Sequence, residues 1–534
     1  MELTFRRTGL LLSEDKREHL AKLETRLSEL EYLFNCNIND MEQQVLFTRE
    51  ELDGLPDSYF CSLGTKQDNG ETRYIVTTSY CHYLPVMKYA RNEDTRKLLY
   101  TAMESRCSEN ISILEEAVQI RSEKAQLLGY TSFSEYMLET RSASTPNVAL
   151  EMLGKLRGRL TVLAKKELNE IEALKRLDMK TSKLPFKGVF EWDIEHYICK
   201  AAAPKLELKE KFCEYFSMDT VLPNLLTFFQ ELFGVSIIHM ENSNVWNPDV
   251  VALEIWESDK ETFIGSLYLD LYARDGKANQ AALFPLCYGH QRRDGSRKHA
   301  AMALILDFPM PSYPNPTLLE HADVCTLMSM LGQAIYNTCS ITRLSELYTD
   351  SRDTFSEAIA QMAEHFAWEP SVLRRIAVHC QSGKPIPDDI LTALVANKNV
   401  GSGLSNLRQL FYGMYDLSIH NSTKDVVDIQ KIYNEMAKDV AMINNGDAAT
   451  LGAATFSHIM SDYESIYFEY LQAAIYGADL FLKHNLRDDT DNIKPIAEFG
   501  RDMLRPVSGS NKMKHMSSFH GRDPNCEAFL KLLA

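Results

Sequence analysis

Several features that mark large protein classes are missing from this 534-residue sequence. Its 11 cysteines are odd in number and contain no C-x-x-C pair, which favours reduced thiols over a disulfide framework. The longest apolar run, near residues 300–308, is far too short to span a membrane. No basic patch offsets the formal charge of −17, which disfavours nucleic acids and anionic membranes. We therefore expect a cytoplasmic protein with no nucleic-acid and no membrane partner.

The sequence contains helical patterns that are interrupted by a short β-rich region. Leucines at 20, 23, 27 and 30 recur at three- and four-residue spacing, which predicts an amphipathic helix from Glu14 to about Asn35. The same pattern covers 93–138 and 147–177, and we expect a short hairpin at 59–77. β-Branched and aromatic runs predict strands at 250–255, 263–272, 281–286 and 302–308. Helical periodicity then returns, so the fold class is mainly α with a small sheet.

No complete metal site, catalytic triad or phosphate loop is found in the sequence. His321 and Cys325 are four residues apart on a predicted helix, but two ligands do not make a zinc site, and packing is the favoured interpretation. Ser329 has no evident base that would activate it as a nucleophile. Nothing electropositive nearby would lower the pKa of the Cys325 thiol. The residues alone therefore identify no reaction.

A family resemblance is carried by segments spread in order over essentially the whole chain. They are HYLPVMK (82–88), VWNPDV (245–250), FIGSLYLDLYARDGKANQAA (263–282), FSEAIAQMAEHFAW (355–368), NLRQLFYGMYDLSIH (406–420) and GRDPNCEAFLK (521–531). The sequence resembles the family of zinc metallopeptidases that contains thimet oligopeptidase, neurolysin, saccharolysin and the mitochondrial intermediate peptidases. The resemblance implies a zincin-like fold of two helical lobes with a deep central channel, in which a small sheet lies beside the metal site.

The resemblance also implies how the chain is divided. We expect an N-terminal helical lobe at 1–205 and the metallopeptidase-like region at 206–534, with the sheet at about 250–308 and the two lobes interleaved. Members of the family have a substantial helical segment before the point at which this sequence begins. We therefore expect part of one lobe, or of a lid over the channel, to be absent.

The residues at the family's zinc site are changed in this sequence. In the family, zinc lies on an H-E-x-x-H helix whose glutamate activates the bound water. The matching stretch TLMSMLGQAIY (326–336) places Ser329 and Gln333 where the two histidines belong and Met330 where the base belongs. Hydroxyl, carboxamide and thioether groups cannot replace these functions. We expect neither a bound metal nor another cofactor.

Three further residues belong to the same comparison with the family. Glu357 matches the third zinc ligand, and Glu364 matches a second acidic residue further along the same helix face. Gln280 replaces a family histidine in the glycine-lysine segment. Alternatively, the two glutamates form an ion-paired helix face with Arg343 or Arg352.

The segment 456–470 resembles the family's glycine-rich loop and the helix that contacts substrate. Its glycines are replaced by Ser457, Ser461, Asp462 and Ile466, so we expect loss of positive φ angles and a stiffer wall. The polar residues are kept, and we assign ligand binding or catalysis to them. They are His458, Tyr463, Tyr467 and Tyr470. Packing between helices is the alternative for each tyrosine.

Three functions follow as hypotheses. The first is a metal-independent enzyme in which the histidine, the tyrosines and Glu357 act on a peptide-like or small natural-product substrate. The second is a non-catalytic peptide-binding protein or scaffold. The third and least favoured is residual peptidase activity through an unconventional zinc site, because too few ligands remain.

Overall fold

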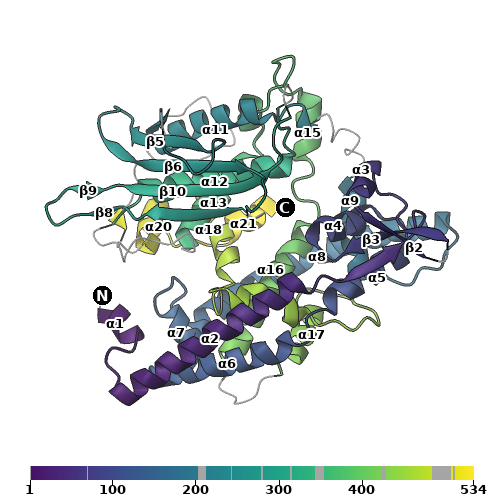
Figure 1. Ribbon diagram of the computed structural model, residues 1–534, viewed down its shortest axis with the longest axis horizontal. Coiled ribbons are helices and arrows are strands. Elements are labelled where there is room, and N and C mark those ends of the chain that lie inside the picture. The colour runs from purple at the N-terminus through teal and green to yellow at the C-terminus, as the bar shows by residue number, and fades with distance from the viewer. Residues whose placement is uncertain are drawn as a thin grey trace. The chain divides into compact units, whose positions relative to one another are not determined.

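The computed structural model describes residues 2–68, 70–202, 212–241, 243–277, 281–312, 316–342, 354–422, 428–483, 507–508 and 512–533. Its contacts divide the chain into two compact units (Figure 1). The first unit joins residues 1–204 to 400–469, and the second joins 205–399 to 470–534. Residues 400–469, which we expected in the second region, thus pack with the N-terminal part.

The first unit is a set of helices with one small sheet. Its helices are α1 (Glu2–Arg7), α2 (Glu14–Asp40), α3 (Asp57–Cys61), α4 (Tyr80–Tyr89), α5 (Glu93–Glu104), α6 (Asn110–Leu127), α7 (Phe133–Leu138), α8 (Pro146–Thr181), α9 (Glu191–Ala202), α16 (Ser402–His420), α17 (Ile429–Asp439), η3 (Gly452–Thr455) and η4 (Ser457–Met460). The predicted leucine stripe of α2 is buried, and α2 packs on α6. The long helix α8 packs on α16 and begins at Thr145, whose side chain accepts a hydrogen bond from the Val148 N–H group.

The small sheet of the first unit contains β1 (Gln44–Phe47), β2 (Gly64–Asp68) and β3 (Glu71–Thr77) in the order β1-β3-β2. All of its pairings are antiparallel. The strands β2 and β3 form the hairpin predicted within 59–77. The first part of that range instead belongs to the short helix α3, so the strands begin later than the aromatic residues suggested.

The second unit is built on a mixed five-stranded sheet. Its strands are β4 (Val235–His239), β5 (Val251–Glu257), β6 (Phe263–Tyr272), β7 (Ala282–Cys287) and β10 (Ala300–Phe308), in the order β4-β5-β6-β10-β7. Only the β6–β10 pairing is parallel. All four predicted strands are confirmed. Strands β6 and β10 are largely buried, whereas β7 at the edge of the sheet buries only Leu283.

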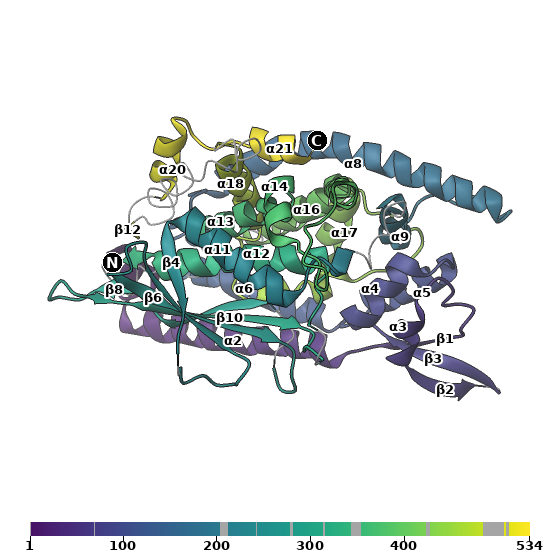
Figure 2. The same ribbon diagram turned by 90° about the horizontal axis from the view of Figure 1, so that it is seen from above.

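Helices cover one face of this sheet. Figures 1 and 2 show α11 (Met218–Phe233), α12 (His321–Cys339) and α13 (Thr354–Phe366) on the same side of it. Helix α12 packs directly on β6, β7 and β10, and α13 packs on α12. The remaining elements of the unit are α14 (Pro370–Ile376), α15 (Asp388–Val395), α18 (Glu469–Lys483), α20 (Lys512–His520), α21 (Glu527–Leu533), and the two-residue strands β8 (His290–Gln291), β9 (Arg297–Lys298), β11 (Ile341–Thr342) and β12 (Val507–Ser508). None of the helices in the described part of the chain combines the length and the apolar composition needed to cross a membrane.

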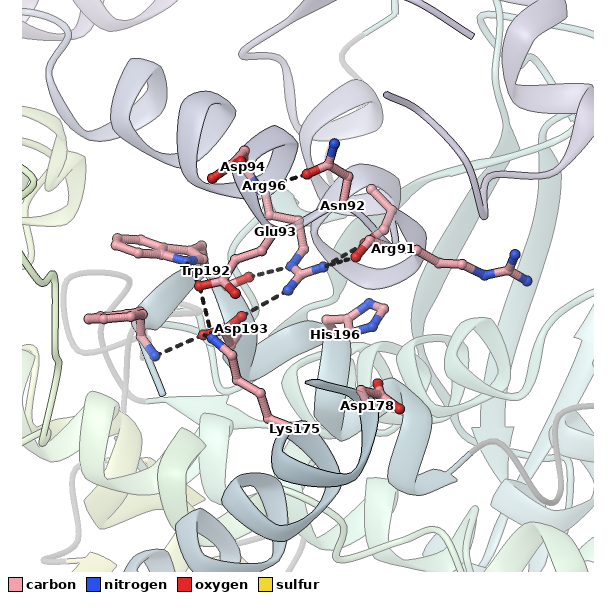
Figure 3. A network of polar contacts seen from close by, with 12 residues as sticks. Arg91, Asn92, Glu93, Asp94, Arg96, Lys175, Asp178, Trp192, Asp193 and His196 are labelled. Carbon is pink, nitrogen blue, oxygen red and sulfur yellow. Dashed lines mark hydrogen bonds and ion pairs between the residues drawn. The ribbon is translucent and has the colours of Figure 1, made fainter. Parts of the chain in front are cut away.

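A buried network of charges ties α5, α8 and α9 together in the first unit (Figure 3). The Asp193 carboxylate accepts hydrogen bonds from Arg96 Nη2 at 2.8 Å and from Lys175 Nζ at 2.6 Å. The backbone N–H group of Phe190 donates a third bond to it at 2.9 Å. Because the two cations and the carboxylate are fully buried, removing one partner leaves an uncompensated charge in the interior.

Candidate functional site

Helices α12 and α13 approach each other very closely at the position that matches the family's metal site. A Cβ atom placed on Gly332 would lie 2.6 Å from the Ala363 Cβ, so only glycine allows this separation. Ser329 and Gln333 are one turn apart on α12 and therefore share a face. Ser329 and Met330 are half-buried, whereas Gln333 is buried.

The Glu357 carboxylate on α13 is bound by two carboxamides. Gln333 Nε2 donates to Glu357 Oε2 at 3.3 Å, and Gln361 Nε2 donates to Glu357 Oε1 at 3.2 Å. Burial raises the pKa of Glu357, and the hydrogen bonds from Gln361 and Gln333 oppose that rise. The structure thus brings together two of the residues that the sequence assigned to this site. It also adds Gln361, one helical turn after Glu357, which sequence reasoning missed.

Glu364 lies two turns further along α13 and is half-buried. Burial and the neighbouring charge of Glu357 raise the pKa of Glu364, and Lys398 opposes the rise. Two adjacent carboxyl groups with raised pKa values hold protons more readily than surface glutamates do. The alternative partners Arg343 and Arg352, as well as the predicted site residue Gln280, lie outside the described residues.

The donor set on α12 and α13 does not suit the zinc ion of the family. Glu357 is the one strong zinc donor among the residues at the matched ligand positions, since Ser329 and Gln333 offer only a hydroxyl and a carboxamide. Within the described ranges, no three His, Cys, Asp or Glu side chains are grouped so as to hold a metal ion. The Gln333 amide instead donates a hydrogen bond to Glu357 Oε2.

His321 and Cys325 contact each other near the start of α12, with His321 Nδ1 3.6 Å from Cys325 Sγ. His321 Nε2 also donates to the Ala367 carbonyl at 2.8 Å. Burial lowers the pKa of His321 to about 4 and raises the pKa of Cys325 well above its ordinary value. Both groups are therefore neutral, which makes the thiol a poor nucleophile and agrees with the packing role expected from sequence.

His458, Tyr463 and Tyr467 gather in the first unit. The His458 ring centroid lies 5.7 Å from that of Tyr463 and 5.2 Å from that of Tyr467, both edge-on. Burial lowers the pKa of His458, so its imidazole is neutral and able to accept a proton. Tyr463 and His458 are half-buried, whereas Tyr467 is buried. Tyr470 is half-buried in the first turn of α18, at the start of the second unit.

Two aromatic residues and a glutamine that sequence reasoning did not single out support this cluster. Tyr467 Oη donates to Gln409 Oε1 at 2.8 Å, and burial raises the pKa of this phenol. Phe456 packs edge-on against Tyr467 and is stacked on Tyr412 at 4.6 Å. Gln409 and Tyr412 both lie in the family segment 406–420, so the resemblance of that segment could have pointed to them.

The expectation that the loop loses positive φ angles is wrong at Asp462, whereas Ser457, Ser461 and Ile466 have no positive φ. Asp462 has φ +65° and Ser465 has φ +63°, both in the left-handed region that glycine normally occupies. Of the four residues that replace glycines, Asp462 therefore keeps a glycine-like backbone, and Ser465 adds a second left-handed position nearby. Each costs free energy relative to glycine, so other contacts must hold the loop in place.

Comparison with known proteins agrees with this architecture. The family model described as peptidase family M3 matches residues 86–534. Saccharolysin of Saccharomyces cerevisiae is 30% identical, and the alignment covers 98% of this chain and 76% of saccharolysin. Oligopeptidase A of Escherichia coli is 29% identical, with 99% of this chain and 79% of that protein covered.

Solved structures support the fold at low sequence identity. A putative peptidase from Chlamydophila abortus has a TM-score of 0.56 and 11% identity, with 98% of this chain and 73% of that chain covered. PZ peptidase A with an inhibitor has a TM-score of 0.52 and 11% identity, with 98% and 76% covered. At this identity the structures show the fold alone. The family model and the saccharolysin alignment go further, and they confirm the resemblance noted in the sequence: the chain belongs to peptidase family M3.

Proposed function

We propose that this chain is a zinc-independent member of peptidase family M3 that binds and converts a peptide-like or small natural-product ligand. The observation that carries the proposal is the hydrogen bond from Gln333 to Glu357. An amide donor stabilises the carboxylate in the place where the family uses a cation. The site is therefore complete in its hydrogen bonding without a metal.

The proposal assigns the chemistry to His458, Tyr463 and Tyr467. A neutral imidazole has a free lone pair that can take up a proton, and its lowered pKa makes it a weaker base than an exposed histidine. Tyr463 beside it supplies a hydroxyl group to bind a carbonyl or stabilise a developing oxyanion, and Tyr467 can do so only by exchanging its hydrogen bond to Gln409. Glu357 and Tyr470 are assigned secondary roles as a proton-holding carboxyl group and a ligand-binding hydroxyl group.

A non-catalytic peptide-binding protein is the second candidate, and one observation favours it. The Tyr467 hydroxyl is committed to Gln409, and burial raises its pKa, so this phenol donates a hydrogen bond but gives up its proton reluctantly. Such a group suits binding more than acid catalysis. Residual metallopeptidase activity ranks last because one glutamate is too little to hold zinc tightly.

The deciding experiment incubates the EDTA-treated protein with a tryptic digest of casein and with a cell extract of small metabolites. Mass spectrometry then compares both mixtures before and after incubation. Consumption of a compound with a new product supports the metal-independent enzyme. Retention of an unchanged compound on the protein supports the binding function instead, and cleavage that appears only after zinc is added would overturn the proposal.

Substitutions at His458 and Tyr467 test whether these residues are responsible for the conversion or retention of a compound. His458→Ala and Tyr467→Phe should abolish conversion or retention. Tyr59→Phe is the matched control, because Tyr59 is also a buried tyrosine of the first unit, and its hydroxyl donates to the His82 carbonyl at 2.8 Å. If conversion survives both site variants, His458 and Tyr467 have no part in it.

A further inference from the structure

The segment that carries His458 and Tyr467 is held by buried and half-buried side chains from three helices of the first unit. From α6, Arg121 Nη1 donates to the Ile459 carbonyl at 2.8 Å and Asn110 Nδ2 donates to the Ala454 carbonyl at 2.9 Å. From α2, Asn35 Nδ2 donates to the Met460 carbonyl at 2.9 Å. The carbonyls of residues 459 and 460 directly follow His458, so these bonds fix its backbone.

Asp416 on α16 holds the other end of the segment. Its Oδ1 accepts from the Ser465 N–H group at 2.8 Å, and its Oδ2 accepts from the Tyr467 N–H group at 3.1 Å. The first of these amides belongs to the left-handed residue Ser465, and the second lies two residues after it. A fully buried carboxylate thus binds the backbone at the point where it is strained.

The two ends are joined through His420. Its Nδ1 donates to Asp416 Oδ1 at 2.9 Å, and its Nε2 accepts from Arg121 Nη1 at 3.2 Å. Because an arginine can only donate, the hydrogen bonds require the neutral tautomer with the proton on Nδ1. Arg121 Nη2 also donates to Glu31 Oε1 at 3.2 Å, which gives the buried guanidinium a counter-charge.

We propose that Asp416, His420 and Arg121 form one positioning unit that sets the orientation of His458 and Tyr467 without contacting ligand themselves. The inference deepens the proposed function and rests on it for its biological meaning. Its structural content is independent, because it predicts what happens to His458 even when no ligand is known. The three residues are positioning residues and not catalytic ones.

The test is the rate at which diethylpyrocarbonate modifies His458, measured by peptide mapping in the free, full-length protein. Asp416→Asn should change that rate several-fold. An asparagine has one acceptor oxygen for three converging donors, and its NH2 group opposes at least one of them. His379, a half-buried histidine of the second unit, serves as the internal reference and should not change.

A matched control separates positioning from general loss of stability. Asp193 is also a fully buried aspartate of the first unit that accepts three hydrogen bonds, two from cations and one from a backbone N–H group (Figure 3). Asp193→Asn should lower the thermal midpoint yet leave the rate at His458 unchanged. Equal effects of the two substitutions on His458, or no effect of Asp416→Asn, would overturn the inference.

A second variant covers the case in which Asp416→Asn does not fold. Arg121→Lys keeps the buried charge, but a single ammonium cannot reproduce the guanidinium bonds to Ile459, His420 and Glu31. It should also change the rate at His458, and an unchanged rate in this folded variant would overturn the inference. Failure of this inference can be told apart from failure of the proposed function. If His458→Ala leaves conversion intact while Asp416→Asn still alters modification of His458, the positioning unit stands and the proposed role of His458 falls.

Discussion

Among single residues, Gln333 and Glu357 decide whether the site on α12 and α13 takes a metal. Restoring the family's ligands with the triple variant S329H/M330E/Q333H should create stoichiometric zinc binding. Two imidazoles four residues apart would then share the face of α12 from which Gln333 reaches Glu357 of α13. Competition with a chromophoric chelator measures the affinity. The same triple variant carrying Glu357→Gln should bind zinc much more weakly. Equal zinc affinity in the original chain and the triple variant would contradict our view of the donor set.

Glu364 gives a residue-scale prediction about pH. Its pKa is raised in the folded protein, so the unfolded chain ionises first, and the folded state loses stability as pH rises from the ordinary value of 4.5 through the raised value. Glu364→Gln should therefore raise the thermal midpoint at neutral pH.

The advantage of Glu364→Gln should shrink as the pH is lowered to the ordinary glutamate value, because both states then hold the proton. Thermal unfolding followed by circular dichroism across this range checks the sign. Glu151→Gln on the exposed side of α8 is the control, since Glu151 makes only a surface pair with Lys155. A gain for Glu364→Gln that did not depend on pH would show that its charge is not the cause.

At the scale of secondary-structure elements, the close approach of α12 and α13 depends on Gly332. Gly332→Ala places a methyl group 2.6 Å from the Ala363 Cβ and should cost about 1–3 kcal/mol through displaced helices. Gly158→Ala in α8 is the matched control. Nothing lies within 4 Å of its added Cβ, so the better helix propensity of alanine should stabilise the protein by up to about 1 kcal/mol. Urea unfolding measures both, and destabilisation by both would contradict the steric explanation.

The charge network of α5, α8 and α9 gives a second prediction at this scale. Asp193→Asn removes the buried carboxylate that Arg96 and Lys175 share and leaves Lys175 with the partly exposed Glu93, so it should cost about 3–5 kcal/mol. The exposed pair of Lys155 and Glu151 supplies the comparison, because Glu151→Gln should cost less than about 1 kcal/mol. Chemical denaturation of both variants measures the difference. Similar small costs would mean that water reaches the network.

The elements also show what the sequence could and could not reveal. The strands of the five-stranded sheet and the leucine stripe of α2 are encoded by local patterns and were predicted from them. The pairing of Gln333 with Glu357 was reachable only through the family resemblance, because 24 residues separate them. The left-handed backbone at Asp462 was mispredicted. The nearby left-handed residue Ser465 donates its N–H group to Asp416, a long-range bond that no local pattern encodes.

At the scale of the whole molecule, the chain crosses between its two units three times, so neither the sequence range 1–205 nor 206–534 is a packing unit. Helix α16 buries its apolar face within the first unit and packs on α8. The backbone N–H groups of Gly403 and Leu404 at its start both donate to the Glu167 carboxylate of α8, each at 2.8 Å. The partner of the α8 stripe therefore lies more than two hundred residues away, where composition and periodicity could not locate it.

This interleaving predicts which fragments fold. Residues 1–204 alone should lack a cooperative unfolding transition, because the apolar stripe of α8 loses the helix that buries it. Joining residues 204 and 400 by a short glycine-serine linker, with the chain continued to Glu469, should restore cooperativity. A short linker is enough because Gly401 lies beside α9: a Cβ atom placed on it would be 2.6 Å from Ile198 Cδ1. Near-ultraviolet circular dichroism during urea titration compares the two fragments. Cooperative unfolding of residues 1–204 by themselves would contradict the division of the chain into these two units. It would mean that the apolar stripe of α8 is buried without α16.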